Sequence, residues 1–244
     1  VNRRVAGVCA DYHFPPTPAS KQNLLREGVP AADIVLTGNT VVDALQWMEA
    51  RLDGIPLPDG IGDAGRLILV TAHRHESFGE PFRNLCFALR DLAERFDDVQ
   101  LVYPVHLNPN VRAPVNEILA GNPRIRLLEP LPYDRFVRLL YRADLILTDS
   151  GGIQEEAPAL GKPTLVLREK TERPEAVQAG VVRLVGTDRR RIVEQASRLL
   201  SDPEAYAAMA RRMFVYGDGR ASQRIGEVLV DGRLTTPEFA PQLD

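Results

Sequence analysis

The sequence predicts an α/β protein built on a doubly wound parallel sheet. From Arg66 onward, short apolar runs alternate with stretches of helical periodicity, which is the pattern of strands joined by helices. The apolar runs lack polar alternation, as expected for parallel strands that are buried on both faces. The expected strands are Leu67–Thr71, Val99–Val105, Ile125–Leu128, Leu145–Thr148, Thr164–Leu167 and Val182–Val185.

Helices are expected between and after these strands. The clearest is Pro81–Phe96, where apolar side chains recur at helical spacing and form one face that packs on the sheet. Core packing alone explains the members of this face, which are Phe82, Leu85, Leu89, Leu92 and Phe96. The other expected helices are Val111–Ala120, Tyr133–Tyr141, Arg189–Ser201, Glu204–Met213 and Ala221–Val230.

The two ends of the chain carry weaker patterns. Val5–Phe14 is expected to be a lone strand with no partner strand nearby in the sequence, followed by a helix at Ala19–Glu27. Leu52–Gly65 is interrupted by glycine and proline, which predicts a surface loop. Pro237 and Pro241 indicate a loose C-terminal tail.

The composition favours a soluble globular protein and argues against several functional classes. Of the 244 residues, 44% are hydrophobic and 26% are charged, which suits one or two cores. A net charge of −3 without a basic block argues against nucleic-acid binding, and no apolar run reaches the roughly 20 residues of a spanning helix. Cys9 and Cys86 have no zinc-site or disulfide spacing. We therefore expect a cytoplasmic protein with no membrane partner.

Residues 148–158 (TDSGGIQEEAP) are the most informative stretch, because they join the end of an apolar strand to a helix through two glycines. Gly151 and Gly152 let a ligand approach the backbone, and the first N–H groups of the helix carry the positive end of its dipole. Phosphate binds well there. Glu156, one turn into the helix, could accept hydrogen bonds from two ribose hydroxyls, which favours a nucleotide. The alternative is an ordinary turn that happens to use glycine.

Three more polar segments follow expected strands, at the edge where open α/β sheets bind ligands. They are residues 70–79 (VTAHRHESFG), 103–109 (YPVHLNP) and 171–176 (TERPEA). Together with residues 36–40 (LTGNT) and 149–158, they closely resemble the non-hydrolysing UDP-N-acetylglucosamine 2-epimerases in order and spacing, from Asn2 to about Gly219. One departure is His75, where that family more often has arginine.

This resemblance implies a Rossmann-like fold and the C-terminal half of a two-domain enzyme of the glycosyltransferase-B architecture. Residues 1–36 would be the remnant of an N-terminal Rossmann-like domain, residues 37–230 the UDP-binding domain and residues 231–244 a tail. Val1 is not a start methionine. We therefore expect most of the N-terminal domain, with the family's catalytic carboxylates, to be absent from this chain.

The implied reaction interconverts UDP-N-acetylglucosamine and UDP-N-acetylmannosamine and supplies precursors of surface polysaccharides. UDP is eliminated across C1 and C2 to give a 2-acetamidoglucal, and is then added back with the opposite configuration at C2. The resemblance implies no cofactor, and a homodimer. The fragment itself is expected to bind UDP and to be inactive alone.

The resemblance also assigns the parts of UDP to particular residues. It places the diphosphate on Ser150, Gly151 and Gly152, the ribose on Glu156, and the UDP moiety on Arg173 as well.

Leu131 and Phe136 fall where the family contacts uracil, although Phe136 fits a core position equally well. Arg74 and His106 match positions that, in some members, touch a second UDP-N-acetylglucosamine acting as an activator. His106 could instead cap the loop before Pro109.

The resemblance makes His73 the expected catalytic residue. It follows a strand, and histidine titrates near neutrality, which is compatible with that role. It could exchange a proton or hold the phosphate oxygen as it leaves; a histidine satisfied within its own loop is the alternative. His73, His75 and Glu76 could also suggest a metal site. No further ligand set with metal spacing exists among only four histidines, so no metal is expected.

Other functional classes share parts of this pattern. Hydrolysing 2-epimerases, which release UDP and free N-acetylmannosamine, share the fold and the UDP site, and so do glycosyltransferases of the same architecture. The match across residues 73–79 and 171–176 argues against a glycosyltransferase. A non-catalytic nucleotide-binding module is the alternative outside the enzymes.

Overall fold

The computed structural model describes residues 2–62 and 65–243, which form two compact units. The small unit combines the residues up to Trp47 with Phe214–Gln242, and the sheet unit is Met48–Met213. This division differs from the boundaries that we predicted after residues 36 and 230. The segments that follow Gly38 and Tyr216 are tied together, since the Asn39 amide donates to the Tyr216 carbonyl at 2.7 Å.

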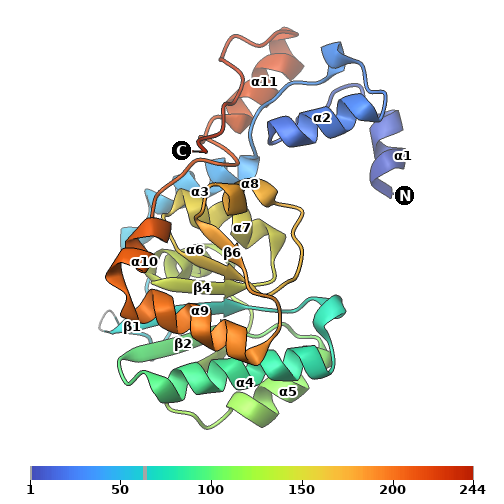
Figure 1. The fold of residues 1–244 in the computed structure, drawn as a ribbon. Helices are drawn as coiled ribbons and strands as arrows, with labels where there is room; N and C mark the ends of the chain where they lie inside the picture. The colour runs from blue at the N-terminus through green and yellow to red at the C-terminus, as the bar shows by residue number, and fades with distance from the viewer. Residues whose placement is uncertain (1, 63–64, 244) are drawn as a thin grey trace. The chain divides into compact units, whose positions relative to one another are not determined.

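The sheet unit contains six parallel strands in the order β3-β2-β1-β4-β5-β6 (Figure 1). Every predicted strand is confirmed, with ends that differ by no more than one residue. The observed strands are β1 (Arg66–Thr71), β2 (Val99–Pro104), β3 (Ile125–Leu128), β4 (Leu145–Thr148), β5 (Thr164–Val166) and β6 (Val182–Leu184). The fold class is therefore α/β and Rossmann-like, as the sequence predicted.

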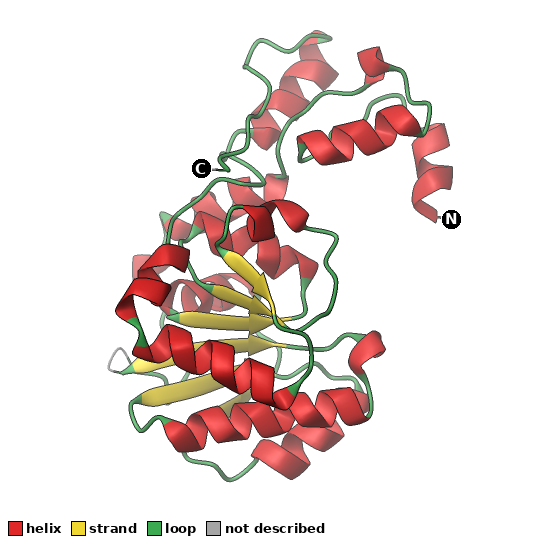
Figure 2. Ribbon diagram, in the orientation of Figure 1, coloured by secondary structure: helices red, strands yellow, loops and turns green. Residues whose placement is uncertain are grey.

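Helices cover both faces of this sheet, as Figure 2 shows. Right-handed connections between parallel strands require the helices to change face when the direction of strand addition reverses. The helices α4 (Glu80–Arg95), α5 (Pro109–Leu119) and α9 (Arg189–Ser201) pack together. The connections after β3, β4 and β5 use α6 (Tyr133–Arg142), α7 (Gly151–Ala159) and α8 (Pro174–Gln178). Helix α10 is Pro203–Met209, so the predicted helix through Met213 ends early.

The reversal of strand order places β1 beside β4, with Thr71 in register with Thr148. Open α/β sheets bind ligands outside the carboxyl ends of the strands at such a switch point. The core beneath it is fully buried and runs from Ile68 through Phe82 and Leu147 to Ile192. The segments that follow β1 and β4 therefore rest on a rigid base.

The small unit contains α1 (Asn2–Cys9), α2 (Pro18–Arg26) and α11 (Ala221–Asp231), together with most of α3 (Thr40–Glu49). The predicted strand Val5–Phe14 is wrong: its first half belongs to the helix α1, and His13 makes only an isolated bridge with Ile34. A strand without neighbours leaves its backbone groups unpaired, whereas a helix pairs them within itself. The helices α1, α3 and α8 were not predicted.

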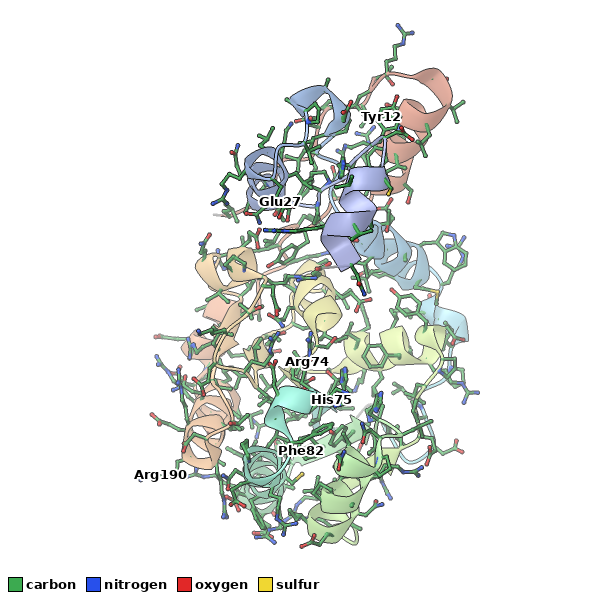
Figure 3. The ribbon with its side chains drawn as sticks, turned by 90° about the vertical axis from the view of Figure 1, so that its right-hand side faces the viewer. Tyr12, Glu27, Arg74, His75, Phe82 and Arg190 are labelled. Carbon is green, nitrogen blue, oxygen red and sulfur yellow. The ribbon has the colours of Figure 1, made fainter. Side chains whose placement is uncertain are left out.

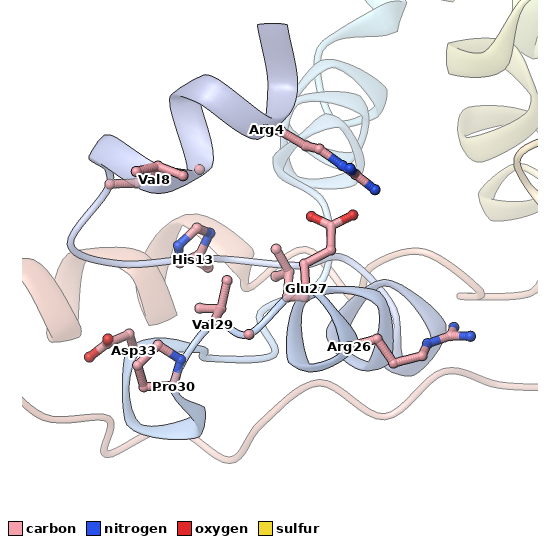
Figure 4. Close-up of a pocket in the computed structure, with 12 residues that line it drawn as sticks. Arg4, Val8, His13, Arg26, Glu27, Val29, Pro30 and Asp33 are labelled. Atoms are coloured by element: carbon pink, nitrogen blue, oxygen red, sulfur yellow. The ribbon is translucent and has the colours of Figure 1, made fainter. Parts of the chain in front are cut away.

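An open hollow of about 610 Å³ lies in the small unit, where Arg4 and Glu27 point toward one another (Figure 4). It contains none of the residues that the sequence singled out for binding or catalysis. Within the described ranges, no helix is both long and apolar enough to span a membrane.

Candidate nucleotide site

Most of the predicted site residues gather at the carboxyl ends of β1, β2 and β4. Figure 3 looks onto this edge of the sheet unit, with Arg74 and His75 on the segment that follows β1. A cavity of about 230 Å³ opens there. It is lined by the predicted residues His73, His106, Leu131, Phe136 and Ser150, together with Thr71, Ala72, Pro104, Pro130 and Ile153.

The helix α7 begins at Gly151, immediately after the N-cap Ser150. Neither Gly151 nor Gly152 has a positive φ, and a Cβ added to either would find its nearest neighbours at 3.7 Å or more. The fold therefore does not require glycine at these two positions. Glycine here leaves open the space directly in front of the first N–H groups of the helix, which is where an anion binds.

Two guanidinium groups flank this helix terminus. The Arg173 Cζ lies 3.7 Å from the position of a Cβ on Gly151, and an Arg74 Nη lies 3.8 Å from it. Arg173 Nε donates to the buried carboxylate of Glu155 at 2.5 Å, and Arg74 Nε donates to the Asp149 carbonyl at 3.2 Å. Both cations are thus held at the place where the helix dipole already favours negative charge.

The segment after β1 is anchored by Asp149, whose side chain is only 1% exposed. Its Oδ2 accepts the backbone N–H groups of His73 at 2.7 Å and of Arg74 at 2.8 Å. Its Oδ1 has no hydrogen-bond partner and lies 3.4 Å from His73 Nδ1. Asp149 follows β4 directly, so it ties the two central strands together at their carboxyl ends.

The His73 ring is stacked on the ring of His106, with centroids 5.2 Å apart and an interplanar angle of 13°. His106 Nδ1 accepts the Asn108 amide at 3.1 Å, so the predicted loop-capping alternative is present in the structure. Burial lowers the pKa of His73, and His106 and Arg74 act in the same direction, whereas Asp149 opposes them. His73 is therefore a half-buried, mainly neutral base at neutral pH.

Glu156 lies on the buried face of α7, one turn beyond the glycines. The hydroxyl of Tyr133, in the first turn of α6, donates to Glu156 Oε1 at 3.0 Å. Burial raises the pKa of Glu156 to about 7, although the hydrogen bond from Tyr133 acts in the opposite direction. Glu156 is poised between its neutral and ionised forms at physiological pH.

Leu131 and Phe136 supply the apolar wall of the cavity. Phe136 is half-buried, whereas its helix neighbours Leu139 and Leu140 are completely buried. Phe136 lies on the same face of α6 as these two residues, but at its edge, where it lines the cavity.

A buried arginine links the two loops on either side of the cations. Arg168 is only 7% exposed; it donates from Nε to Glu76 at 2.6 Å and from both terminal nitrogens to Glu172, at 2.9 and 3.0 Å. Glu76 belongs to the segment that carries His73, and Glu172 directly precedes Arg173. Arg168 in turn lowers the pKa of Glu172 to about 2.

This arrangement can be compared with known proteins. The family model of the UDP-N-acetylglucosamine 2-epimerases matches residues 1–230. The chain belongs to this family. It is 53% identical over 242 residues to the UDP-N-acetylglucosamine 2-epimerase of Escherichia coli K12, an alignment that covers 96% of this chain and 64% of that protein. The chain thus spans slightly less than two thirds of the length of that relative.

Solved structures of family members have the same fold. The UDP-GlcNAc 2-epimerase of Neisseria meningitidis, bound to UDP-GlcNAc, superposes with a TM-score of 0.90 at 44% identity and covers 94% of this chain and 64% of its own. The enzyme of Methanocaldococcus jannaschii, in complex with UDP-GlcNAc and UDP, gives a TM-score of 0.73 at 30% identity, with 91% and 62% covered.

Four contributors to this candidate site were not assigned a role from the sequence. They are Asp149, which anchors the His73 segment; Tyr133, which holds Glu156; Glu155, which holds Arg173; and Arg168. A role for Asp149 could have been predicted from the sequence, since a carboxylate directly after a central strand lies at the point where the strand order of the sheet reverses. The Tyr133 and Arg168 contacts join residues from different segments, and no local pattern predicts them.

Proposed function

We propose that this chain binds UDP at the N-terminus of α7, and that a protein containing it interconverts UDP-N-acetylglucosamine and UDP-N-acetylmannosamine. The observation that carries the proposal is the open helix terminus at Gly151 and Gly152, flanked by the guanidinium groups of Arg173 and Arg74. Family membership supports the same substrate class.

The diphosphate is assigned to Ser150, Gly151 and Gly152, with Arg173 as its cation. Backbone N–H groups and a guanidinium are both suited to phosphate oxygens. The ribose is assigned to Glu156, because an ionised carboxylate one turn into the helix can accept from both of its hydroxyls. Displacement of Tyr133 by a ribose hydroxyl would free Oε1 for that purpose.

Uracil is assigned to the apolar wall formed by Leu131 and Phe136. The cavity of about 230 Å³ is too small for a whole UDP-sugar, so it holds one end of the ligand while the diphosphate lies at its rim. His73 lines the cavity together with Ser150, the N-cap of α7, so we assign His73 to the rim where the diphosphate lies.

The proposed chemistry breaks the C1–O bond while a base takes the proton from C2, which yields UDP and a 2-acetamidoglucal. UDP then adds back at C1, and a proton returns to C2 on the opposite face. Preorganised donors at a leaving group contribute roughly 10²–10³ each in rate. In this scheme α7 and Arg173 stabilise the departing diphosphate, and His73 exchanges a proton with its β-phosphate oxygen.

We expect the isolated chain to bind UDP without measurable epimerisation. The described lining of the cavity contains histidine and serine but no carboxylate that could take the C2 proton. Of the nearby carboxylates, those of Glu155, Glu76 and Glu172 are engaged with arginines. Glu156 is assigned to the ribose, and Asp149 is buried beneath the His73 segment. A base for C2 would therefore come from residues outside this chain.

The test has two parts. UDP should raise the melting temperature of this chain, because a ligand that binds only the native state stabilises it by mass action. UDP-N-acetylglucosamine incubated with the chain in D₂O should acquire no deuterium at C2. Failure of UDP to bind would contradict the proposed binding site. Deuterium at C2 would show that the chain itself supplies the base that takes the C2 proton.

Two related activities are separated by their products. A hydrolysing 2-epimerase would release free N-acetylmannosamine, whereas the proposed reaction keeps the sugar on UDP.

Arg74 and His106 lie next to His73, which supports their assignment to a second UDP-N-acetylglucosamine that acts as an activator. A homodimer and a role in polysaccharide synthesis complete the proposal.

A further inference from the structure

The buried carboxylate of Asp149 uses only half of its hydrogen-bonding capacity. Oδ2 accepts two backbone N–H groups, whereas Oδ1 accepts none, although the side chain is only 1% exposed. Of the buried side-chain nitrogen and oxygen atoms in the described ranges, Asp149 Oδ1 is the one without a partner. A buried polar atom without a partner is costly, so its retention calls for an explanation.

The nearest candidate partner is the imidazole of His73. Its Nδ1 lies 3.4 Å from Oδ1, so a small rotation of the ring brings the pair to hydrogen-bonding distance. The other constraint on the ring is its stack against His106, which is itself fixed by the Asn108 amide.

We propose that Asp149 is a positioning residue for His73, because it accepts the Nδ1 proton and thereby leaves Nε2 as the atom that exchanges protons. The inference rests on the proposed function, in which His73 meets the departing diphosphate. Neutral His73 with its proton on Nδ1 first takes up a second proton from water at Nε2, beside the diphosphate. As the C1–O bond breaks, it gives that Nε2 proton to the β-phosphate oxygen and returns to the Nδ1–H tautomer. The proton returns to Nε2 when the bond forms again.

Anchoring of the loop does not require this arrangement. The two amides of His73 and Arg74 use Oδ2 alone, and an asparagine carbonyl could accept both of them. A carboxylate at this position, in place of an amide, is needed only if Oδ1 also accepts a hydrogen bond. Among the charged groups that influence His73, Asp149 favours the protonated ring, and Arg74, His75 and His106 disfavour it.

The direct test is the tautomer of His73 in this chain without nucleotide, measured by long-range ¹H–¹⁵N NMR of the imidazole rings. The sequence has only four histidines, so a His73→Gln variant assigns the signals. We expect neutral His73 to carry its proton on Nδ1. An Nε2–H tautomer in the wild-type chain would overturn the proposal, and this result does not depend on whether any variant folds.

The Asp149→Asn variant extends the test. Its amide nitrogen would face Nδ1 as a donor, so we expect the His73 tautomer to switch to Nε2–H and the pKa of His73 to fall further. Asp144→Asn is the matched control, because Asp144 flanks the other end of β4 and also accepts a backbone amide, that of Leu67 at 2.7 Å. If the tautomer and pKa of His73 are unchanged in Asp149→Asn, Asp149 only anchors the backbone of the His73 segment and the proposal is wrong.

The tautomer measurement and the UDP titration distinguish failure of this inference from failure of the proposed function. If UDP does not bind but the tautomer is Nδ1–H, the positioning contact exists and the nucleotide assignment fails. If UDP binds and the tautomer is Nε2–H, the nucleotide site stands and the role of Asp149 is lost.

Discussion

The Tyr133 hydroxyl donates to Glu156 across the gap between α6 and α7, at an O···O distance of 3.0 Å. Glu156 is almost completely buried, and burial raises its pKa to about 7. Ribose hydroxyls need an ionised acceptor to gain the full strength of a charge-assisted hydrogen bond. Under the proposed assignment of the ribose to Glu156, the protonation of this side chain is therefore linked to the binding of nucleotide.

UDP affinity should accordingly depend on the ionisation of Glu156. As the pH falls through about 7, Glu156 takes up a proton in the free protein and UDP binding weakens. Calorimetric titration between pH 6 and 8.5 measures this. The Glu156→Gln variant serves as the control, because it removes this titrating group and leaves the titrations of UDP and of the other groups, His73 included, in place. Identical pH dependence in the two proteins would remove Glu156 from the ribose site.

The buried Glu156 carboxylate should also lower the free energy of unfolding at high pH, where it is ionised. Its native pKa of about 7 exceeds the ordinary value of 4.5, so the native state holds an extra proton between these values and loses stability as the pH rises through them. Glu156→Gln should therefore stabilise the chain at pH 8 by up to about 3 kcal/mol, and by almost nothing below pH 4.5. Urea denaturation at the two pH values tests the sign.

Most of the fold could be predicted because buried parallel strands leave a local signal. The apolar runs of β1 and β4 predict these two strands directly, and the glycines between β4 and α7 predict the candidate phosphate site. The predicted lone strand Val5–Phe14 was wrong, since a short segment without partner strands in the sequence gives no signal that separates a strand from the short helix α1. The contacts of Tyr133 and Arg168 could not be predicted, because they depend on which segments the topology brings together.

Arg168→Lys should loosen both loops that carry the site. Lysine keeps the charge but cannot reach Glu76 and the two oxygens of Glu172 at once, so we expect a loss of about 1–2 kcal/mol in stability and weaker UDP binding. Arg83→Lys is a matched control, since Arg83 makes a two-pronged pair with Glu117 on the exposed surface, and should change neither quantity. Equal effects of the two substitutions would contradict a special role for Arg168.

In a chain extended to the length of its relatives, His73→Ala should lower turnover by roughly 10²–10⁴ and leave UDP affinity nearly unchanged. The reason is that the proposed contact strengthens only as the C1–O bond breaks. Steady-state kinetics and UDP titration measure the two quantities separately. Parallel losses in both would mean that His73 merely holds the nucleotide.

The central claim is that UDP places its diphosphate against Gly152 at the start of α7. Calorimetric titration of UDP into the wild-type chain, Gly152→Ala and Gly226→Ala tests it most directly, because a Cβ at Gly226, in the middle of α11, meets nothing within 4 Å. Each alanine should raise stability by up to about 1 kcal/mol. We predict that Gly152→Ala weakens UDP binding by about tenfold or more, equivalent to about 1.4 kcal/mol, whereas Gly226→Ala binds like the wild type. Equal affinity in all three proteins, or no binding to any of them, would contradict the account.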